Sequence, residues 1–213
     1  MSRDLEVAAN HRDSFPDAFF KGSNVTNDDK RIMWQGSHLD LVMRGHWEFV
    51  QRKNITGIVC IVALTDDGKI VLVEQYRPPV AGRVIELPAG LVGDGPGREA
   101  EPLESAARRE LIEETGYDAG RIEQVFDGVP SAGLCDEHIT FFLATELTKV
   151  GPGGGDHNED ITVLEAPLDG LLDYLDARVR TGVKVDAKIF SPLYVIEKEG
   201  FTPRARRRRK GTD

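Results

Sequence analysis

Apolar side chains in the middle of the chain recur in short runs whose lengths suit buried strands. The clearest are ITGIVCIVAL at 55–64 and KIVLVEQ at 69–75, joined by TDDG, in which the Asp67-Gly68 pair is a strong hairpin signal. These residues predict a central β-hairpin. Further runs of alternating or apolar character predict strands at RVIELPAG (83–90), RIEQVFDGV (121–129), HITFFLATEL (138–147) and ITVLEAPL (161–168).

Three other segments carry a helical pattern. The first begins at Pro102, a residue favoured at the first helical position, and runs about fourteen residues to a stop at Gly116. The second, LDGLLDYLDARVR at 168–180, repeats Leu and Val at helical spacing and should face the core. The third, DAKIFSPLYVIEK, contains Pro192, which either kinks the helix or marks its start after Ser191 as the N-cap.

The order of these elements indicates the fold class. Strands outnumber helices and do not alternate with them regularly, so we expect an α+β fold with a mixed β-sheet sandwiched between helices. The short runs RIMW and LDLVM suggest extra strands, and we expect residues 1–50 to form an N-terminal β arm. A main domain over 51–200 and a disordered basic tail over 201–213 complete the predicted organisation.

Composition narrows the class of protein. At 213 residues and 40% hydrophobic content, the chain suits one globular domain with an interface arm. The charged start MSRDLEVAANHRD lacks the apolar core of a secretory signal, and no apolar stretch approaches a membrane span, so we expect a cytoplasmic protein without membrane contact. Two cysteines, Cys60 in an apolar run and Cys135 in a loop, fit a reducing compartment and are expected to be inert.

The formal net charge of -9 includes a basic segment at the C-terminal end of the sequence. RARRRRKGTD at 204–213 holds six positive charges and one negative, which leaves residues 1–203 at -14. So acidic a body binds polyphosphate or nucleic acid poorly, and anionic substrates would need cations supplied locally. The tail offers charge for a nucleic-acid contact but no fold element or aromatic platform, so nucleic-acid binding is not expected.

Three glutamates lie in the last turns of the first helix, where the negative end of the helix and their mutual repulsion disfavour them. On a helical wheel Glu110 and Glu114 continue the small apolar stripe of Ala106 and Ala107, with Glu113 beside them. Carboxylates aimed into a cleft repel less when divalent cations lie between them, and oxygen ligands favour Mg²⁺ or Mn²⁺. We therefore expect the glutamates to face metal ions and, through them, phosphate.

The same region resembles the Nudix box, G-x5-E-x7-R-E-U-x-E-E-x-G-U with U a bulky apolar residue. Gly95 fits the spacing, but ELPAG also resembles the approach to the box, which makes Gly90 the box glycine. Ten residues then lie between Gly90 and Glu101 where the box has five, so we interpret this loop as carrying an insertion. The other matching residues are Glu101, Arg109, Glu110, Leu111, Glu113, Glu114, Gly116 and Tyr117.

The resemblance extends from about Trp47 to Val195 and is nearest to the ADP-ribose pyrophosphatase branch, as in WEFVQR, VEQYRPPVAGRVIELPAGL, ESAARRELIEETGY and VDAKIFSPL. It implies Mg²⁺-dependent hydrolysis of ADP-ribose to AMP and ribose 5-phosphate by homodimers whose N-terminal strands reach into the partner's site. It also implies that Arg109 orients the glutamates and pairs with Glu101. The implied metal ligands are Glu110, Glu114 and the backbone carbonyl of Ala89, with Glu113 assisting.

Substrate contacts are implied in the same way. Arg77 in QYRPP matches a position that contacts phosphate, which suits a forked guanidinium, although a surface arginine at a strand end is the alternative. Trp47, with Glu48 and Arg52, matches the segment that holds the nucleobase. Trp34 either supplies a second stacking face or belongs to the core or an interface. Further implied contacts are Leu91, Ser131 and Glu137, of which Glu137 could also help to bind metal.

A base must take the proton of the attacking water, and in the resembling enzymes it is a glutamate on a loop before the last strand. Glu159 in GDHNEDITV matches that position, with Asp160 and His157 as rivals. Glycines 153–155 give this loop freedom to close over substrate. His138 is expected to begin a strand.

One departure bears on specificity. ADP-ribose enzymes of this type usually have a proline where this chain has Ala132, in PSAGL, although the turn glycine Gly133 remains. Other nucleoside diphosphate sugars, such as GDP-mannose or UDP-glucose, therefore stay open as substrates. A non-catalytic ADP-ribose-sensing Nudix protein is the alternative class, but such a protein would be expected to have lost box carboxylates, and the box is complete here.

Overall fold

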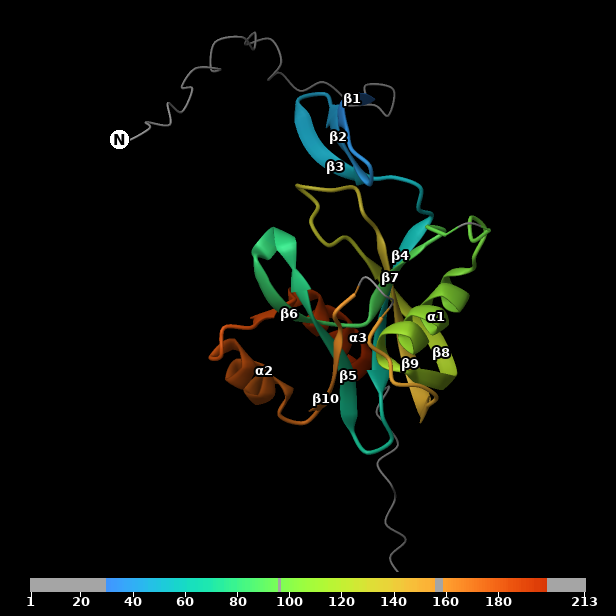
Figure 1. The fold of residues 1–213 in the computed structure, drawn as a ribbon, viewed down its shortest axis with the longest axis vertical. Helices are drawn as coiled ribbons and strands as arrows, with labels where there is room; N and C mark the ends of the chain where they lie inside the picture. Colours follow the sequence, from blue (N-terminus) through green and yellow to red (C-terminus); the bar gives the residue numbers. More distant parts are fainter. Residues whose placement is uncertain (1–29, 96, 156–158, 199–213) are drawn as a thin grey trace, which may run out of the picture.

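The computed structural model describes residues 30–95, 97–155 and 159–198. A small antiparallel sheet stands at one end of the molecule (Figure 1) and comprises β1 (Lys30–Gln35), β2 (Leu39–Arg44) and β3 (Trp47–Arg52). The strands predicted from RIMW and LDLVM are thus confirmed. We call this sheet the arm; residues 1–29 and the predicted tail lie outside the described residues.

The main sheet is mixed, as predicted. Its order is β11-β6-β5-β4-β9-β8, with β10 paired to β5 and β7 paired to β4. The pairs β4–β9 and β11–β6 are parallel and the others are antiparallel. The strands are β4 (Gly57–Leu64), β5 (Lys69–Arg77), β6 (Gly82–Glu86), β7 (Ala89–Val92), β8 (Tyr117–Gly128), β9 (Ile139–Lys149), β10 (Thr162–Pro167) and β11 (Lys184–Val185).

Helices cover both faces of this sheet. The elements are α1 (Leu103–Thr115), α2 (Leu171–Val179), α3 (Phe190–Lys198) and the 3-10 turns η3 (Pro78–Val80) and η4 (Ala187–Ile189). Along β4, Cys60 and its alternate neighbours pack toward α2 and α3, whereas Ile61 and its alternate neighbours pack toward α1. The sheet is therefore buried on both sides, which confirms the predicted α+β sandwich. No helix in the described parts of the chain has the length and apolar character needed to cross a membrane.

The strands β4 and β5 pair directly only beside their hairpin turn, at Ala63–Val71 and Leu64–Ile70. Farther along they diverge, because β6 pairs with β5 and β7 pairs with β4. The strand predicted at 83–90 is confirmed as β6 up to Glu86, but the prediction missed that a second strand, β7, begins at Ala89. The chain crosses from one strand to the other at Pro88, which has no N–H to donate but whose carbonyl accepts from the Ile61 amide at 2.8 Å. This divergence creates the space for a cleft.

Several predicted ends shift. Pro102 is the N-cap of α1 rather than its first residue, whereas Gly116 ends the helix as predicted, in the left-handed region at φ 70°. β8 begins directly after it, at Tyr117, four residues before the predicted start. Pro192 neither kinks α3 nor marks its start, because the helix begins at Phe190 and the proline falls in the first turn, where its missing N–H has no helical partner.

Candidate active site

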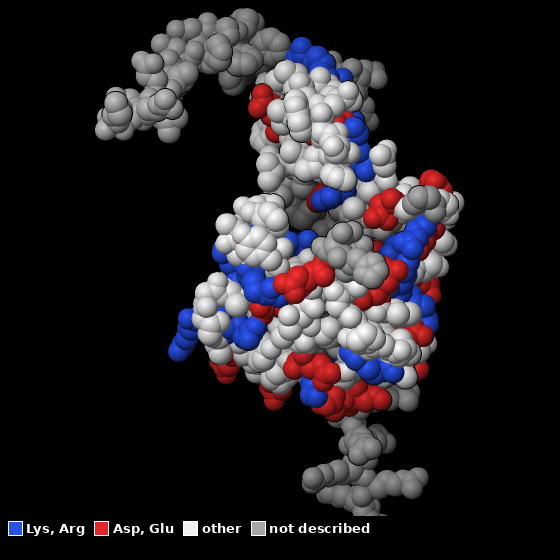
Figure 2. Space-filling model, viewed as in Figure 1, with Lys and Arg blue, Asp and Glu red and all other residues white. Residues whose placement is uncertain are grey.

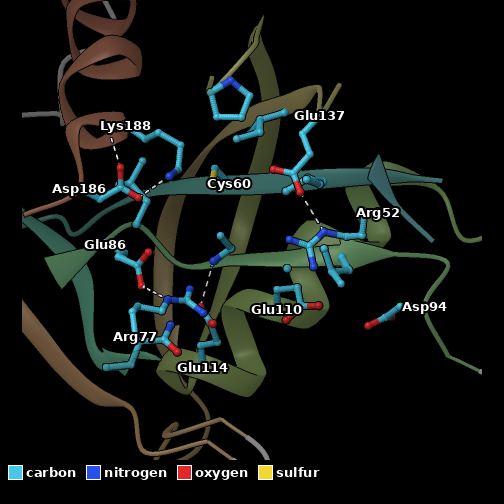
Figure 3. A pocket seen from close by; sticks show the side chains of 18 of the residues that line it. Arg52, Cys60, Arg77, Glu86, Asp94, Glu110, Glu114, Glu137, Asp186 and Lys188 are labelled. Carbon is cyan, nitrogen blue, oxygen red and sulfur yellow. Dashed lines mark hydrogen bonds and ion pairs between the residues drawn. The ribbon is translucent and has the colours of Figure 1, made fainter. Parts of the chain in front are cut away.

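A polar cleft of about 360 Å³ opens where β4 and β5 diverge (Figure 3). Its lining comes from β4 and β7 on one side, from β5 and β6 on the other, from α1, from the arm, and from loops near the C-terminal end of the chain. Eight of the predicted site residues line it: Arg52, Arg77, Ala89, Leu91, Glu110, Glu114, Glu137 and Glu159.

Glu114 is the most enclosed carboxyl of the cleft, with only 3% of the residue exposed. Its Oε2 accepts from the backbone N–H of Ala89 at 3.0 Å, so β7 holds the side chain against the floor. Burial raises the pKa of Glu114 well above its usual value, and the like charges of Glu110 and Glu159 raise it further, while the Ala89 bond opposes the rise. The protein thus holds a carboxyl where its charged form is disfavoured.

Glu110 shares this environment. Burial raises its pKa to about 7, against the opposing influence of the Arg109 guanidinium. Its carboxyl lies so close to β7 that a Cβ on Gly90 would stand 1.9 Å from the Glu110 Cδ. Glycine at position 90 is therefore a steric requirement of the site, which supports the interpretation of Gly90 as the box glycine.

Arg109 organises the acidic face of α1 without lining the cleft. Its Nε and Nη2 donate to the two carboxyl oxygens of Glu101 at 3.0 Å each, and its Nη1 donates to Glu110 at 2.7 Å and to Glu113 at 3.0 Å. Nη2 also reaches the carbonyl of Leu91 at 3.3 Å. The predicted pairing of Glu101 with Arg109 is confirmed. Glu113 is half-exposed and faces Arg109 rather than the cleft.

Two further ion pairs flank the glutamates (Figure 3). Arg77 donates to Glu86 at 2.7 Å, and Arg52 donates to Glu137 at 2.9 Å. Both arginines line the cleft, so cationic groups stand on either side of its acidic floor. Arg77 also ends β5 with its side chain 44% exposed, so its contact with phosphate stays a prediction.

The donor set of the cleft suits a hard divalent cation. Glu110 and Glu114 line it together with Glu159 and Asp94, and buried carboxylates with raised pKa values gain from a nearby positive charge. Among residues 30–95, 97–155 and 159–198, no three His, Cys, Asp or Glu side chains already stand in the arrangement of a metal site. One carboxyl oxygen of Glu110 instead accepts a hydrogen bond from Arg109.

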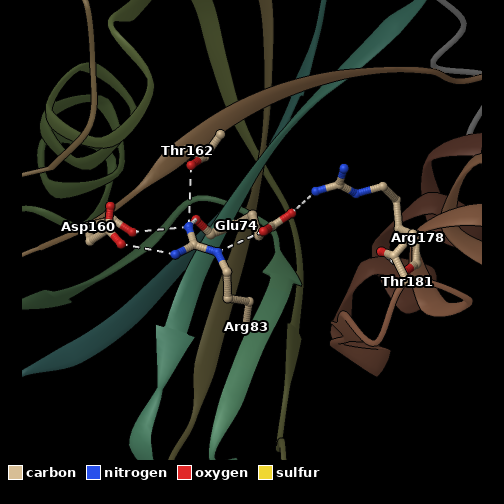
Figure 4. Close-up of polar contacts among 6 residues, drawn as sticks. All are labelled: Glu74, Arg83, Asp160, Thr162, Arg178 and Thr181. Carbon is tan, nitrogen blue, oxygen red and sulfur yellow. Dashed lines mark hydrogen bonds and ion pairs between the residues drawn. The ribbon is translucent and has the colours of Figure 1, made fainter.

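Glu159 and its neighbour point in different directions. Glu159 lines the cleft, whereas the Asp160 carboxylate faces outward and accepts from Arg83 at 2.9 Å (Figure 4). Only Glu159 of this pair is placed to act on a group in the cleft. His157 lies outside the described residues.

Several predicted contacts do not reach the cleft. Trp47, which is 54% exposed, lines a neighbouring cavity of about 420 Å³, and its Nε1 donates to the Gly133 carbonyl at 3.3 Å. Ala132, Glu137 and His138 line the same cavity. The structure does not bring Glu48, Ser131 or Trp34 into the cleft lining either; these residues lie on the arm or on the 131–138 loop beneath it. Their roles stay predictions.

Several lining residues were not anticipated, namely Glu86, Asp94, Asp186, Lys188, Gln75 and the thiol of Cys60. Asp186 caps η4 by accepting from the Lys188 amide at 2.9 Å, and the Lys188 ammonium pairs with the same carboxylate. An Asp before a helical segment signals a cap, but nothing local places it in a cleft built far away along the chain. Burial raises the pKa of Cys60 to about 12, which disfavours the reactive thiolate form.

Comparisons with known proteins identify the family. Residues 55–183 match the NUDIX domain family. The chain is 38% identical over 120 residues to the methanol dehydrogenase activator of Bacillus methanolicus (56% of this chain, 62% of that protein). It is 37% identical over 123 residues to the ADP-ribose pyrophosphatase of Bacillus subtilis (57% and 64%). The chain thus spans under two thirds of the length of both relatives.

A third relative matches over more of its length. The GDP-mannose pyrophosphatase of an Enterobacter species is 31% identical over 194 residues, which cover 87% of this chain and 92% of that protein. Among solved structures, an ADP compounds hydrolase superposes with a TM-score of 0.60 at 18% identity, over 82% of this chain and 94% of the other. The last likeness shows that the fold is shared.

Proposed function

The chain belongs to the Nudix family, and we propose that it hydrolyses the pyrophosphate bond of nucleoside diphosphate sugars with the help of a divalent cation. The preferred substrate in this proposal is ADP-ribose, which would yield AMP and ribose 5-phosphate. The observation that carries it is the convergence of Glu110, Glu114 and Glu159 with Arg77 in one cleft. Carboxylates offer ligands for a hard cation and a base for water, and a guanidinium offers a fork for phosphate.

The proposed cation is Mg²⁺, with Mn²⁺ as a substitute. Glu110, Glu114 and the carbonyl of Ala89 would hold it. Glu113 would assist through Arg109, which also binds Glu110, because Glu113 itself does not line the cleft. The raised pKa values of the two buried glutamates support this assignment, because a cation would relieve their unfavourable charge. When bound, the ion neutralises phosphate charge and makes a water molecule more acidic.

The chain's own side chains have separate tasks in this proposal. Glu159 takes the proton of the attacking water, for which its position in the cleft is suitable. Arg77 contacts a phosphate oxygen. Arg109 keeps Glu110 and Glu113 oriented through its two short contacts. Leu91, Arg52 and Glu137 border the bound substrate.

The nucleoside side of the cleft needs a further contribution. Trp47, Glu48 and Ser131 are outside the cleft of their own chain, and the arm exposes apolar side chains of β1. We infer that two chains form a homodimer in which the arm of each copy completes the nucleobase site of the other. Stacking on the indole of Trp47 would hold the base.

A second substrate is favoured by two observations. Ala132 stands where ADP-ribose enzymes usually have proline, and the relative matched over 92% of its length is named a GDP-mannose pyrophosphatase. GDP-mannose is therefore the alternative substrate, with the same bond cleaved by the same residues. We also propose a cytoplasmic location, which suits the two free thiols, Cys60 and Cys135.

The deciding experiment measures phosphate release, coupled through a phosphatase, from ADP-ribose, GDP-mannose, UDP-glucose and nucleoside triphosphates, each with Mg²⁺ or with EDTA. We expect turnover only with Mg²⁺ and a lead for ADP-ribose in kcat/KM of about tenfold or more, which is roughly 1.4 kcal/mol of discrimination. A lead for GDP-mannose would transfer the proposal to that substrate. Absence of turnover on every compound with Mg²⁺ would contradict the catalytic proposal.

A further inference from the structure

An ion-pair network outside the cleft lining joins β5, β6, α2 and the start of β10 (Figure 4). Its centre is Arg83 on β6, whose guanidinium contacts Glu74, Asp160 and Thr162. None of these residues lines the cleft, yet Asp160 directly follows Glu159, which does. We call Arg83, Glu74, Asp160 and Thr162 the Arg83 clamp.

One side of the clamp is anchored in the sheet. Glu74 is buried on β5, and it accepts from the Arg83 Nε at 2.7 Å through its carboxylate and from the Arg83 Nη2 at 3.0 Å through its backbone carbonyl. The second carboxylate oxygen of Glu74 accepts from Arg178 on α2. Two guanidiniums therefore share one buried carboxylate, and the orientation of Arg83 is determined by the main sheet and by α2.

The other side of the clamp holds the chain entering β10. The Arg83 Nη1 donates to the Asp160 carboxylate at 2.9 Å, and its Nη2 reaches the Asp160 carbonyl at 3.5 Å and the Thr162 hydroxyl at 3.3 Å. The Asp160 side chain is 86% exposed, so its ion pair contributes little to overall stability. What these contacts do is fix the backbone directly after Glu159.

We propose that Arg83 is a positioning residue, which holds Glu159 in the cleft by fixing Asp160 and Thr162 to the buried carboxylate of Glu74. The inference rests on the proposed function, in which Glu159 takes the proton from water. The Glu159 side chain lies close against Gly155: a Cβ on Gly155 would stand 2.8 Å from its Cβ and 2.3 Å from its Oε2. A shift of the 159–162 backbone would move the carboxylate with it, because Glu159 begins this segment.

The fork of an arginine is essential to this role. The three nitrogens of the planar guanidinium bind Glu74 on the sheet and Asp160 before β10 at the same time. A lysine keeps the charge but offers one nitrogen, which cannot hold Glu74 and Asp160 together in the same geometry. Arg83→Lys should therefore recover only part of what Arg83→Gln loses.

The test compares steady-state kinetics of the full chain with Mg²⁺ and the preferred sugar nucleotide. For Arg83→Gln and Asp160→Asn we expect kcat to fall about tenfold, because a displaced base acts poorly, while KM stays within about twofold. Asp160→Asn leaves the Glu74 anchor intact, so its Tm should match the wild type. Arg121→Gln removes an exposed arginine on β8 that pairs with its strand neighbour Glu123, and it should change neither constant.

A double-mutant cycle separates the clamp from the base. Glu159→Gln alone should lower kcat strongly, and adding Arg83→Gln to it should cause no further fall, because the clamp acts through Glu159. If Arg83→Gln lowers kcat by the same factor with and without Glu159→Gln, the inference is overturned. It is also overturned if Asp160→Asn and Arg83→Gln both show wild-type kinetics while Glu159→Gln is impaired; that second result would leave the proposed function standing. Unchanged kcat in Glu159→Gln would contradict both the proposed base and the clamp.

Discussion

At the scale of single residues, Glu114 shows how a buried carboxyl opposes stability when it is charged. The group is almost fully buried, its pKa is raised, and it has one backbone donor to offset the loss of water. A folded-state pKa above the unfolded value means that the folded protein binds the proton more tightly. The contribution of this group to stability is therefore greatest at acid pH and is lost as the pH rises toward the folded-state pKa.

Glu114→Gln should abolish metal-dependent turnover and stabilise the cation-free protein. In EDTA at pH 7 to 8 we expect Tm to rise by a few degrees, since about 1 kcal/mol moves Tm by roughly 2–4 °C at this chain length. Near pH 4 the difference should vanish, because the wild-type carboxyl is then protonated. Calorimetry at the two pH values checks the sign. Near-normal activity of the variant would rule out Glu114 as a metal ligand.

At the scale of elements, the contact between β7 and α1 sets the geometry of the acidic floor. β7 pairs with β4 through Gly90–Val59 and carries the amide that binds Glu114, while Gly90 leaves room for the Glu110 carboxyl. The helix brings its glutamates to this strand because its apolar stripe packs on the sheet. Close approach of a strand and a helix thus decides where the carboxylates lie.

Gly90→Ala should displace Glu110, since the added Cβ would overlap its carboxyl. We expect kcat/KM to fall by about 10²-fold, with cooperative unfolding retained, because a misplaced ligand costs catalysis more than stability. Gly151→Ala is the matched control: nothing lies within 4 Å of a Cβ at that position, so its kinetics should be normal. A fully active Gly90→Ala protein would mean that the position of Glu110 is not critical.

At the scale of the whole molecule, the arm is attached mainly through one loop. The amide of Val50 donates to the Leu134 carbonyl at 2.8 Å, and the side chain of Arg52 pairs with Glu137. Figure 2 shows a mostly white surface over the middle of the arm, with charged residues at its edges. Ile32, Met33 and Trp34 are all more than half exposed on β1. Exposed large apolar side chains in succession on an outer strand are typical of an interface.

Ile32→Glu should convert the proposed homodimer into monomers, because it places a charge in the interface that the arm would form. Light scattering coupled to size exclusion would then show the mass of one chain, and kcat/KM would fall because the arm of the partner no longer completes the site. Leu172→Glu, at a residue 65% exposed on α2, is the control and should stay dimeric. A wild-type protein with the mass of one chain would contradict the dimer.

Prediction from sequence succeeded where the signal was local. Asp67-Gly68 marks the hairpin, and Gly116 ends α1 in the conformation that glycine adopts most easily. At 83–90 the sequence predicted one strand, and the second strand after Pro88 was missed. Strand pairing there depends on partners far away in the chain, which a local pattern does not contain. Asp186 and Lys188 were missed for the same reason, since their place in the cleft depends on how η4 packs against the sheet.

The sequence by itself determined that a helix ends in three glutamates, that a mixed sheet lies between helices, and that the chain resembles the Nudix family. Periodicity, turn residues and short motifs act within a few residues, so they can be read without the fold. Only the tertiary structure decided that β4 and β5 diverge to form a cleft, that Glu159 faces it while Asp160 faces Arg83, and that Trp47 lies outside it. Those facts depend on long-range pairing and on side-chain packing, which no local pattern contains.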